Sequence, residues 1–205
     1  MGNLGGASKD IPDERTGLTR REIAVIRDTW AYFCRDLPGN SLAIFYTFFK
    51  RHPDYIKTFS LPEEEASFEK IFKGTFLTSH AIAVAYQLCA TVDVLEDTDL
   101  LVALVRKNAH NHIHKRGVEL VQFQNMYIVI RDVLYEKLDR KRTPKAMQAW
   151  DKMLTFQANV TRTIFNEERP SSAEDSPEGC PTTAFPQPAE ISQGVRTSAG
   201  ETAMK

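Results

Sequence analysis

The sequence predicts an all-α domain with a flexible extension at each end. Apolar residues recur at helical spacing through most of residues 18–168, and no stretch shows the apolar/polar alternation of a half-buried strand. No glycine-rich loop of the kind that cradles phosphate interrupts the pattern. These observations favour a helical sandwich around a ligand over a nucleotide-binding enzyme.

Composition narrows the class of protein further. The 205 residues suffice for one domain of about 150 residues plus extensions, and a net charge of -1 gives no support for a nucleic-acid partner. The sequence has no secretory signal, and no run approaches the roughly 20 apolar residues of a membrane span. We therefore expect a cytoplasmic protein.

Three scattered cysteines do not make a disulfide framework, which agrees with a reducing compartment. Cys34 and Cys89 fall in predicted helices and are expected to be buried free thiols. They could form a redox-sensitive pair only if the fold brings the two helices together.

Residues 1–17 are rich in glycine and charge and show no periodicity, which predicts a mobile arm. Gly2 follows the first methionine, as N-myristoylation requires, although Gly6 stands where the usual motif has serine or threonine. A single acyl chain binds membranes only marginally. Any membrane association through Gly2 is therefore expected to be weak and reversible.

Thr19 and Glu22, three residues apart, can form a capping box and predict the start of the first helix. The segment 37–40 contains a proline and a glycine and is predicted to break that helix, so that the second begins at Asn40 or Ser41. The core face of the first helix is expected to consist of Ile23, Ile26, Trp30 and Phe33.

A histidine falls on the apolar face of the next predicted helix, which spans residues 68–95 after the acidic run 63–65. A lone histidine on such a face is more often a hydrogen-bonded core residue than a ligand. A role as a ligand is favoured here only because a second predicted helix also places a histidine on its apolar face. Around His80, the apolar stripe consists of Phe72, Phe76, Ala83, Val84, Leu88 and Val92.

The second such helix begins near Asp99. At about 100° per residue, His112 returns to within about 20° of Leu101 on the apolar face, whereas His110 and His114 point to the opposite side. An alternative is a strand, on which these three alternating histidines would share a face and bind zinc. The helical period of the preceding residues argues against a strand.

Two more helices and a tail complete the prediction. One helix follows Gly117 and ends near Asp139. The last begins at 143–144, where a threonine caps the helix and a proline occupies its first turn. Residues 169–205 are rich in proline and poor in aromatic residues, which predicts a disordered tail.

Several positions, taken in order and with their spacing, resemble the globin family: Trp30, Pro53, Phe59, His80, His112, Val118 and Phe123. The resemblance covers residues 18–168 and implies the globin fold, a helical sandwich around haem. The step of 32 residues between the two histidines is more similar to neuroglobin and globin X than to myoglobin. Globin X proteins also resemble this chain in having an N-terminus suited to acylation.

The resemblance implies haem b as the cofactor, with His112 as the proximal iron ligand and His80 as the distal residue or second ligand. Two residues depart from the family pattern. Ala83 stands where the family often has a basic residue that holds a haem propionate, and Asn108 stands where it commonly has a leucine behind the proximal histidine ring. The resemblance also implies that Phe59 stacks on the haem and that Phe45 lies over its distal face. Val84 would crowd the sixth iron position, Arg116 would contact a propionate, and Val118 would be the branched residue at the haem edge.

If His80 occupies the sixth position, the implied function is redox chemistry, electron transfer, or the handling or sensing of O2, NO, CO or nitrite, with an unidentified reductase. Nitrite reductase, NO dioxygenase or peroxidase side activities fit this hypothesis, although the sequence does not point to a dedicated enzyme. One alternative is a five-coordinate globin for oxygen storage or transport. Another is a haem-free globin-fold module for protein interaction.

Overall fold

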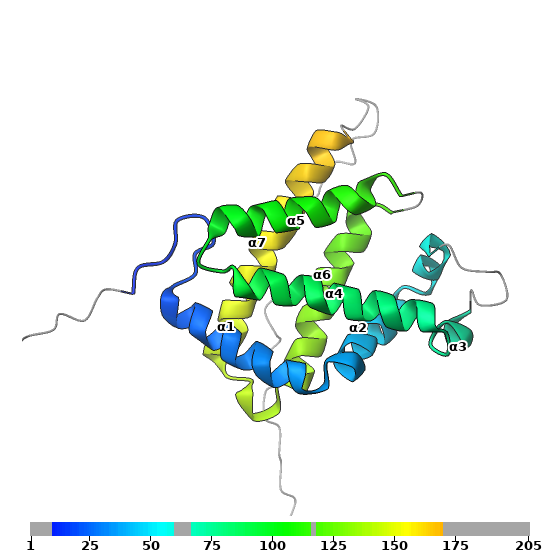
Figure 1. Cartoon of the computed structure of the whole chain (residues 1–205), viewed down its shortest axis with the longest axis horizontal. Helices are drawn as coiled ribbons and strands as arrows, with labels where there is room; N and C mark the ends of the chain where they lie inside the picture. Colours follow the sequence, from blue (N-terminus) through cyan, green and yellow to red (C-terminus); the bar gives the residue numbers. More distant parts are fainter. Residues whose placement is uncertain (1–9, 60–66, 116–117, 170–205) are drawn as a thin grey trace, which may run out of the picture.

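The computed structural model describes residues 10–59, 67–115 and 118–169, and within these ranges the chain forms helices and turns without a strand. The predicted all-α fold class is therefore confirmed. The α-helices, drawn in Figure 1, are α1 (Arg20–Phe33), α2 (Leu37–Arg51), α3 (Phe68–Ile71), α4 (Thr75–Asp93), α5 (Thr98–Ile113), α6 (Leu120–Lys137) and α7 (Pro144–Glu168). Short 3-10 helices span Cys34–Asp36, Pro53–Thr58 and Asp139–Lys141.

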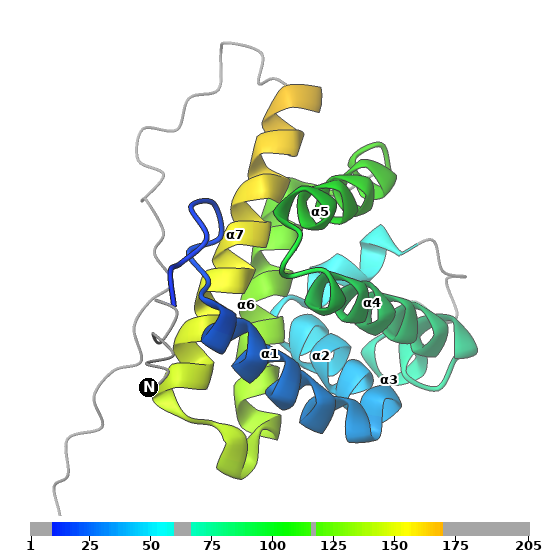
Figure 2. The same ribbon diagram turned by 60° about the vertical axis from the view of Figure 1, so that its left-hand side comes forward.

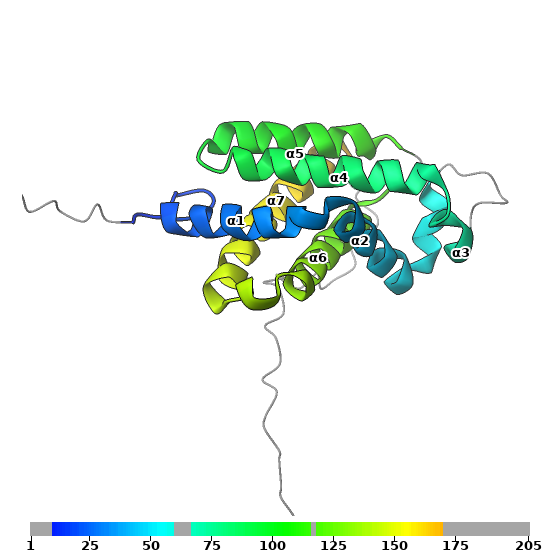
Figure 3. The same cartoon turned by 60° about the horizontal axis from the view of Figure 1, so that its bottom comes forward.

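The long helices form two crossing layers. α4 and α5 lie side by side in one layer, and α6 and α7 cross beneath them (Figure 1, Figure 3). Figure 2 shows α4 and α5 obliquely, with α6 and α7 running alongside each other. α4 packs mainly on α2, whereas α5 packs mainly on α7. The two predicted histidine helices are thus held by different partners.

Two tryptophans join α1 to α7 at the centre of the core. The Trp150 ring lies 5.9 Å from the Trp30 ring, and Trp150 Nε1 donates a hydrogen bond to Thr29 Oγ1 at 2.9 Å. The same hydroxyl donates to the Val25 carbonyl at 2.7 Å. Because the Trp150 Nε1 and the Thr29 hydroxyl both have partners, the Trp150 indole is buried without the cost of an unpaired donor.

The predicted helix starts at Thr19 and Thr143 are confirmed. Thr19 Oγ1 accepts a hydrogen bond from the Glu22 amide, and Glu22 Oε2 accepts one from the Thr19 amide, which completes the capping box. Thr143 Oγ1 accepts from the Ala146 amide, and Pro144 occupies the first turn of α7.

The predicted start of the second helix at Asn40 or Ser41 is wrong by about one turn. α2 begins at Leu37, because the Asp36 carboxylate caps the helix by accepting a hydrogen bond from the Gly39 amide at 3.1 Å. Pro38 lies in the first turn, where its missing amide proton costs nothing. The break between α1 and α2 therefore lies at 34–36, before the proline and glycine that were expected to form it.

The predicted helix over 68–95 is divided in the structure. α3 ends at Ile71, and α4 begins at Thr75 after Gly74. This shifts the core stripe, because Phe76 is 44% exposed while its neighbour Leu77 is fully buried. The acidic run 63–65 lies outside the described residues.

The boundaries of the two predicted extensions also shift. Residues 10–17 include a turn in which the Asp13 carboxylate accepts hydrogen bonds from the amides of Arg15 and Thr16, and Thr16 is buried. At the other end, Arg169 donates to the backbone carbonyls of Ile113 and Val118. Residues with defined contacts are therefore found on both sides of the predicted 18–168 domain.

The fold brings Cys34 and Cys89 together, as a redox-sensitive pair would require, and both are free thiols. Burial, and then the neighbouring Cys89 thiol to which it is hydrogen-bonded, raise the pKa of the Cys34 thiol to about 12. Trp30 Nε1 lies 3.4 Å from Cys89 Sγ. Both cysteines are half-buried and not fully buried as expected, while the high pKa of the Cys34 thiol agrees with the expected unreactive thiol.

One described helix, α4, is long and apolar enough to cross a membrane by length and composition, although no such run was expected. In the fold, α4 packs on α2, α1 and α5. A core helix of a soluble domain passes the same test, so this feature is weak evidence for a membrane span.

Candidate functional site

One cavity lies between α2, α4, α5 and α6, and it encloses about 870 Å³ when the space of its open mouth is included. The residues that line it are ten with apolar and eight with polar side chains, and the polar ones include His80 and His112. The apolar lining consists of Phe45, Phe48, Phe59, Val84, Leu88, Val105, Val118, Phe123, Met126 and Ile130.

His112 enters the cavity from the last turn of α5. Its Nδ1 lies 2.8 Å from the Asn108 carbonyl oxygen, and because a carbonyl only accepts, Nδ1 must carry the proton. Nε2 then keeps its lone pair, the form of imidazole that binds a metal. The Phe123 ring contacts the imidazole edge-to-face with centroids 5.4 Å apart. The ring is therefore fixed in both tautomer and orientation.

His80 enters the same cavity from α4 and is held by rings alone. Phe45 and Phe59 contact the imidazole edge-on at centroid distances of 5.4 and 5.3 Å, and Phe76 lies parallel to it at 6.5 Å. Among the described residues, the structure gives the His80 ring no hydrogen-bond partner. The imidazole is thus packed but not anchored by a polar contact.

Both histidines favour the neutral, ligand-competent form. Burial lowers the pKa of His80 to about 4, with a smaller effect from positive charge on His112. Burial is also the largest cause that lowers the pKa of His112, while its hydrogen bond to Asn108 opposes the shift. At neutral pH, each ring therefore presents an uncharged nitrogen to the cavity.

These observations fit the donor set of a flat iron macrocycle. A planar apolar group needs apolar side chains to pack against, and its metal needs neutral nitrogen donors. The cavity supplies both, with donors from helices in different parts of the fold. His112 and His80 would hold the metal, while Phe45, Phe59 and Val118 would contact the ring.

The structure places most of the sequence-predicted site residues in this cavity wall, namely Phe45, Phe59, His80, Val84, His112 and Val118. His110 and His114 do not line the cavity and are exposed, as the helical phase predicts. Arg116, the predicted propionate partner, and Gly2, the predicted acylation site, lie outside the described residues.

Two features of the site were missed from the sequence. The first is the Asn108 backbone carbonyl, which orients His112 whatever side chain residue 108 carries. The second is Gln157 of α7, which is 3% exposed, lines the cavity, and has a buried Nε2 without a hydrogen-bond partner. Helical spacing gave a signal for Gln157, since it lies one turn from the buried residues Leu154 and Thr161.

Comparison with known proteins agrees with this arrangement. The family model described as Globin matches residues 42–161. A globin from Nerita albicilla is 30% identical over 154 residues, covering 72% of this chain and 93% of the relative. Cytoglobin-2 of Danio rerio is 26% identical over 137 residues, covering 67% of this chain and 76% of the relative.

The fold itself has a solved counterpart. The crystal structure of a hexacoordinated haem protein from an anhydrobiotic tardigrade, determined at pH 4, superposes with a TM-score of 0.69 at 18% sequence identity. The superposition covers 75% of this chain and 99% of the other. The family match over more than half of the chain, together with the relative from Nerita, shows that this chain belongs to the globin family.

Proposed function

We propose that this chain is a haem-binding globin in which His112 is the permanent iron ligand and His80 is an internal ligand that external molecules displace. Haem, when bound, supplies reversible binding of small gases and one-electron redox chemistry. The contrast between the two histidines carries the proposal, because His112 is anchored by a backbone carbonyl and His80 only by ring packing.

The anchored ring is suited to permanent ligation. The Nδ1 hydrogen bond at 2.8 Å raises the basicity of Nε2 and stops the ring from rotating. Asn108 lies four residues before His112 on α5, so the acceptor moves with the ligand. His112 would therefore keep its geometry when the opposite position changes occupant.

The unanchored ring is suited to reversible ligation. Because His80 is tethered to α4 inside the cavity, its effective concentration is high even if its intrinsic affinity is modest. When it rotates away, no hydrogen bond among the described residues must break. An external ligand competes with it, and the apparent affinity falls by the fraction of protein in which the position is open.

This competition favours redox or gas-ligand chemistry over bulk oxygen delivery. Apart from His80, the distal wall formed by Phe45, Phe59 and Val84 is apolar. It offers an incoming ligand no second strong polar partner. We therefore propose O2, NO, CO or nitrite as ligands, with an external reductase as partner. The 32-residue histidine spacing supports the neuroglobin and globin X type within the family.

The deciding experiment is the absorption spectrum of the ferrous protein without added ligand. The wild type is expected to be low-spin with split visible bands, and the His80→Leu variant to become high-spin while retaining haem. Val84→Ala, which changes the same wall without removing a nitrogen, is the control and should stay low-spin.

Other outcomes identify the alternatives. A high-spin wild type would mean a five-coordinate globin of the storage or transport kind. A colourless preparation that ignores added hemin would instead support a haem-free interaction module.

A further inference from the structure

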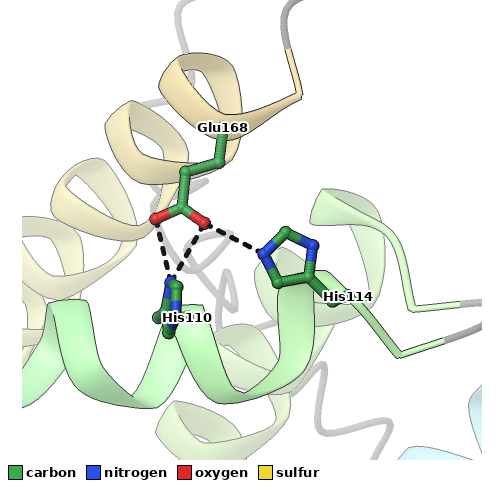
Figure 4. A group of neighbouring side chains, drawn as sticks. All are labelled: His110, His114 and Glu168. Carbon is green, nitrogen blue, oxygen red and sulfur yellow. Dashed lines mark hydrogen bonds and ion pairs between the residues drawn. The ribbon is translucent and has the colours of Figure 1, made fainter.

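A second cluster of histidines lies on the outer face of α5, away from the cavity. His110 and His114 are one helical turn apart, and Glu168 at the end of α7 points toward both (Figure 4). The Glu168 carboxylate oxygens lie 3.1 and 3.2 Å from His110 Nδ1, and Oε2 lies 3.6 Å from His114 Nε2. One donor atom from each residue lies within 4.8 Å of the other two.

We propose that His110, His114 and Glu168 form a Zn²⁺ site. Two histidines at i and i+4 present their nitrogens on one face of a helix, and a carboxylate completes a common set of three protein ligands. Tetrahedral bonds of about 2.1 Å place donor atoms about 3.4 Å apart, so both carboxylate–imidazole separations are already close to that value. The two imidazoles need only small rotations to complete the geometry.

Exposure allows those rotations. The side chains of His110 and His114 are 59% and 68% exposed, whereas the Glu168 side chain is only 26% exposed. The carboxylate is thus the fixed member of the site, and the rings can adjust to it. A fourth position faces solvent and would be filled by water.

The neighbouring charges do not compete for Glu168. Glu167 pairs with Arg106 at 3.4 Å, and Arg169 pairs with Glu119 at 3.2 Å. Within the described part of the chain, the contacts that the structure gives for the Glu168 carboxylate are with the two histidines. The carboxylate therefore remains available to a cation.

The alternative to a zinc site is a cluster in which the three side chains are held together without a metal. Hydrogen bonds and ion pairs between Glu168 and the two histidines could also hold the three side chains together on their own. That arrangement needs no metal. Zinc binding would instead tie the end of α5 to the end of α7 through the metal.

Zinc titration of the untagged full-length protein, followed by calorimetry, tests the proposal. The wild type is expected to bind one Zn²⁺ that the His110→Ala/His114→Ala double variant does not bind, and to ignore Mg²⁺, which prefers oxygen donors. Glu168→Gln should weaken binding by at least about tenfold, since even outer-shell changes cost that much. Glu167→Gln, the matched control one residue away, should bind zinc like the wild type.

Zinc X-ray absorption gives an independent measurement, with two imidazoles expected in the first coordination shell. Absence of zinc binding in the wild type would leave the hydrogen-bonded cluster as the explanation. Binding that persists in the double variant would place the ion elsewhere. Either result overturns the proposal when the protein titrated is loaded with haem, which occupies the nitrogens of His80 and His112.

Discussion

The register of α5 sends His112 into the cavity and His110 to the surface, two residues apart. His112→Ala is therefore expected to abolish stable haem binding, because it removes the anchored nitrogen. His110→Ala should retain haem, because its ring faces Glu168 instead. Soret absorbance after gel filtration measures both. The opposite pattern would show that the helical phase assigned to α5 is wrong.

His80 also makes the haem-free protein sensitive to acid. Its pKa is about 4 in the folded state, below the ordinary value of 6.5, so the unfolded chain binds the proton more readily. Its stabilising contribution is complete above about pH 6.5 and is lost as the pH falls toward 4. The loss is on the order of 3 kcal/mol.

Urea unfolding of the haem-free protein at several pH values measures this effect. His80→Leu is expected to flatten the fall in the free energy of unfolding between pH 6.5 and 4. His52→Leu, a surface histidine stacked on Tyr55, should leave most of the fall in place. Equal slopes in the wild type and His80→Leu would exclude His80 as its source.

At the scale of elements, Arg169 joins the end of α7 to both sides of the connection between α5 and α6. It donates to the Ile113 and Val118 carbonyls and pairs with Glu119. Arg169→Ala should lower the free energy of unfolding by about 1–3 kcal/mol and speed haem dissociation, since Val118 lines the cavity. Denaturant unfolding and haem transfer to an acceptor protein measure these changes.

Arg162→Ala is the matched control. Arg162 also lies on α7, but its hydrogen bond is to Asn159 within the same helix. It should have little effect on haem dissociation. If both variants release haem equally fast, the link through Arg169 does not hold the proximal side.

Helix positions were predictable where the signal is local. The capping box of α1, the threonine cap of α7 and the helical periodicity located α1, α5 and α7, because these determinants lie within a few residues of each other. The start of α2 was missed because Asp36, and not Asn40 or Ser41, caps it, and the division before α4 was missed because the apolar period runs on across the break at Gly74. The contacts of Arg169 were missed because its partners lie more than 50 residues away.

The site shows the same limit. Histidine phase and the family resemblance identified the rings that line the cavity. They gave no access to the Asn108 carbonyl that fixes His112, because every residue carries a carbonyl and only the fold selects one. Helical spacing places Gln157 on the buried face of α7, but it does not show that this part of the face lines the cavity.

At the scale of the whole molecule, the ordered domain is predicted to be residues 10–169. A fragment with these limits should fold and bind haem like the full chain. A fragment of residues 18–169 should be less stable by about 1–2 kcal/mol, because it lacks the Asp13 turn and the Gly17 carbonyl that accepts from Lys152. Thermal unfolding compares them. Failure of the longer fragment to fold would assign a structural role to the segments removed.

Acylation of Gly2 remains a proposal from sequence alone. In cells supplied with a myristate analogue, the wild type is expected to incorporate label and the Gly2→Ala variant is not. The fraction bound to membrane should be small and reversible, as expected for one acyl chain. An unlabelled wild type would remove the reason to expect membrane association.

The separate packing of α4 on α2 and of α5 on α7 has a mechanical consequence. Since α4 and α5 rest on different partners, a group bonded to both His80 and His112 would act as a strut between two halves of the molecule. Replacing His80 by an external ligand would remove the strut at one end. α4 would then become more flexible without a change in the fold. Ligand binding would therefore alter the flexibility of this helix, and faster amide hydrogen exchange along α4 would measure it.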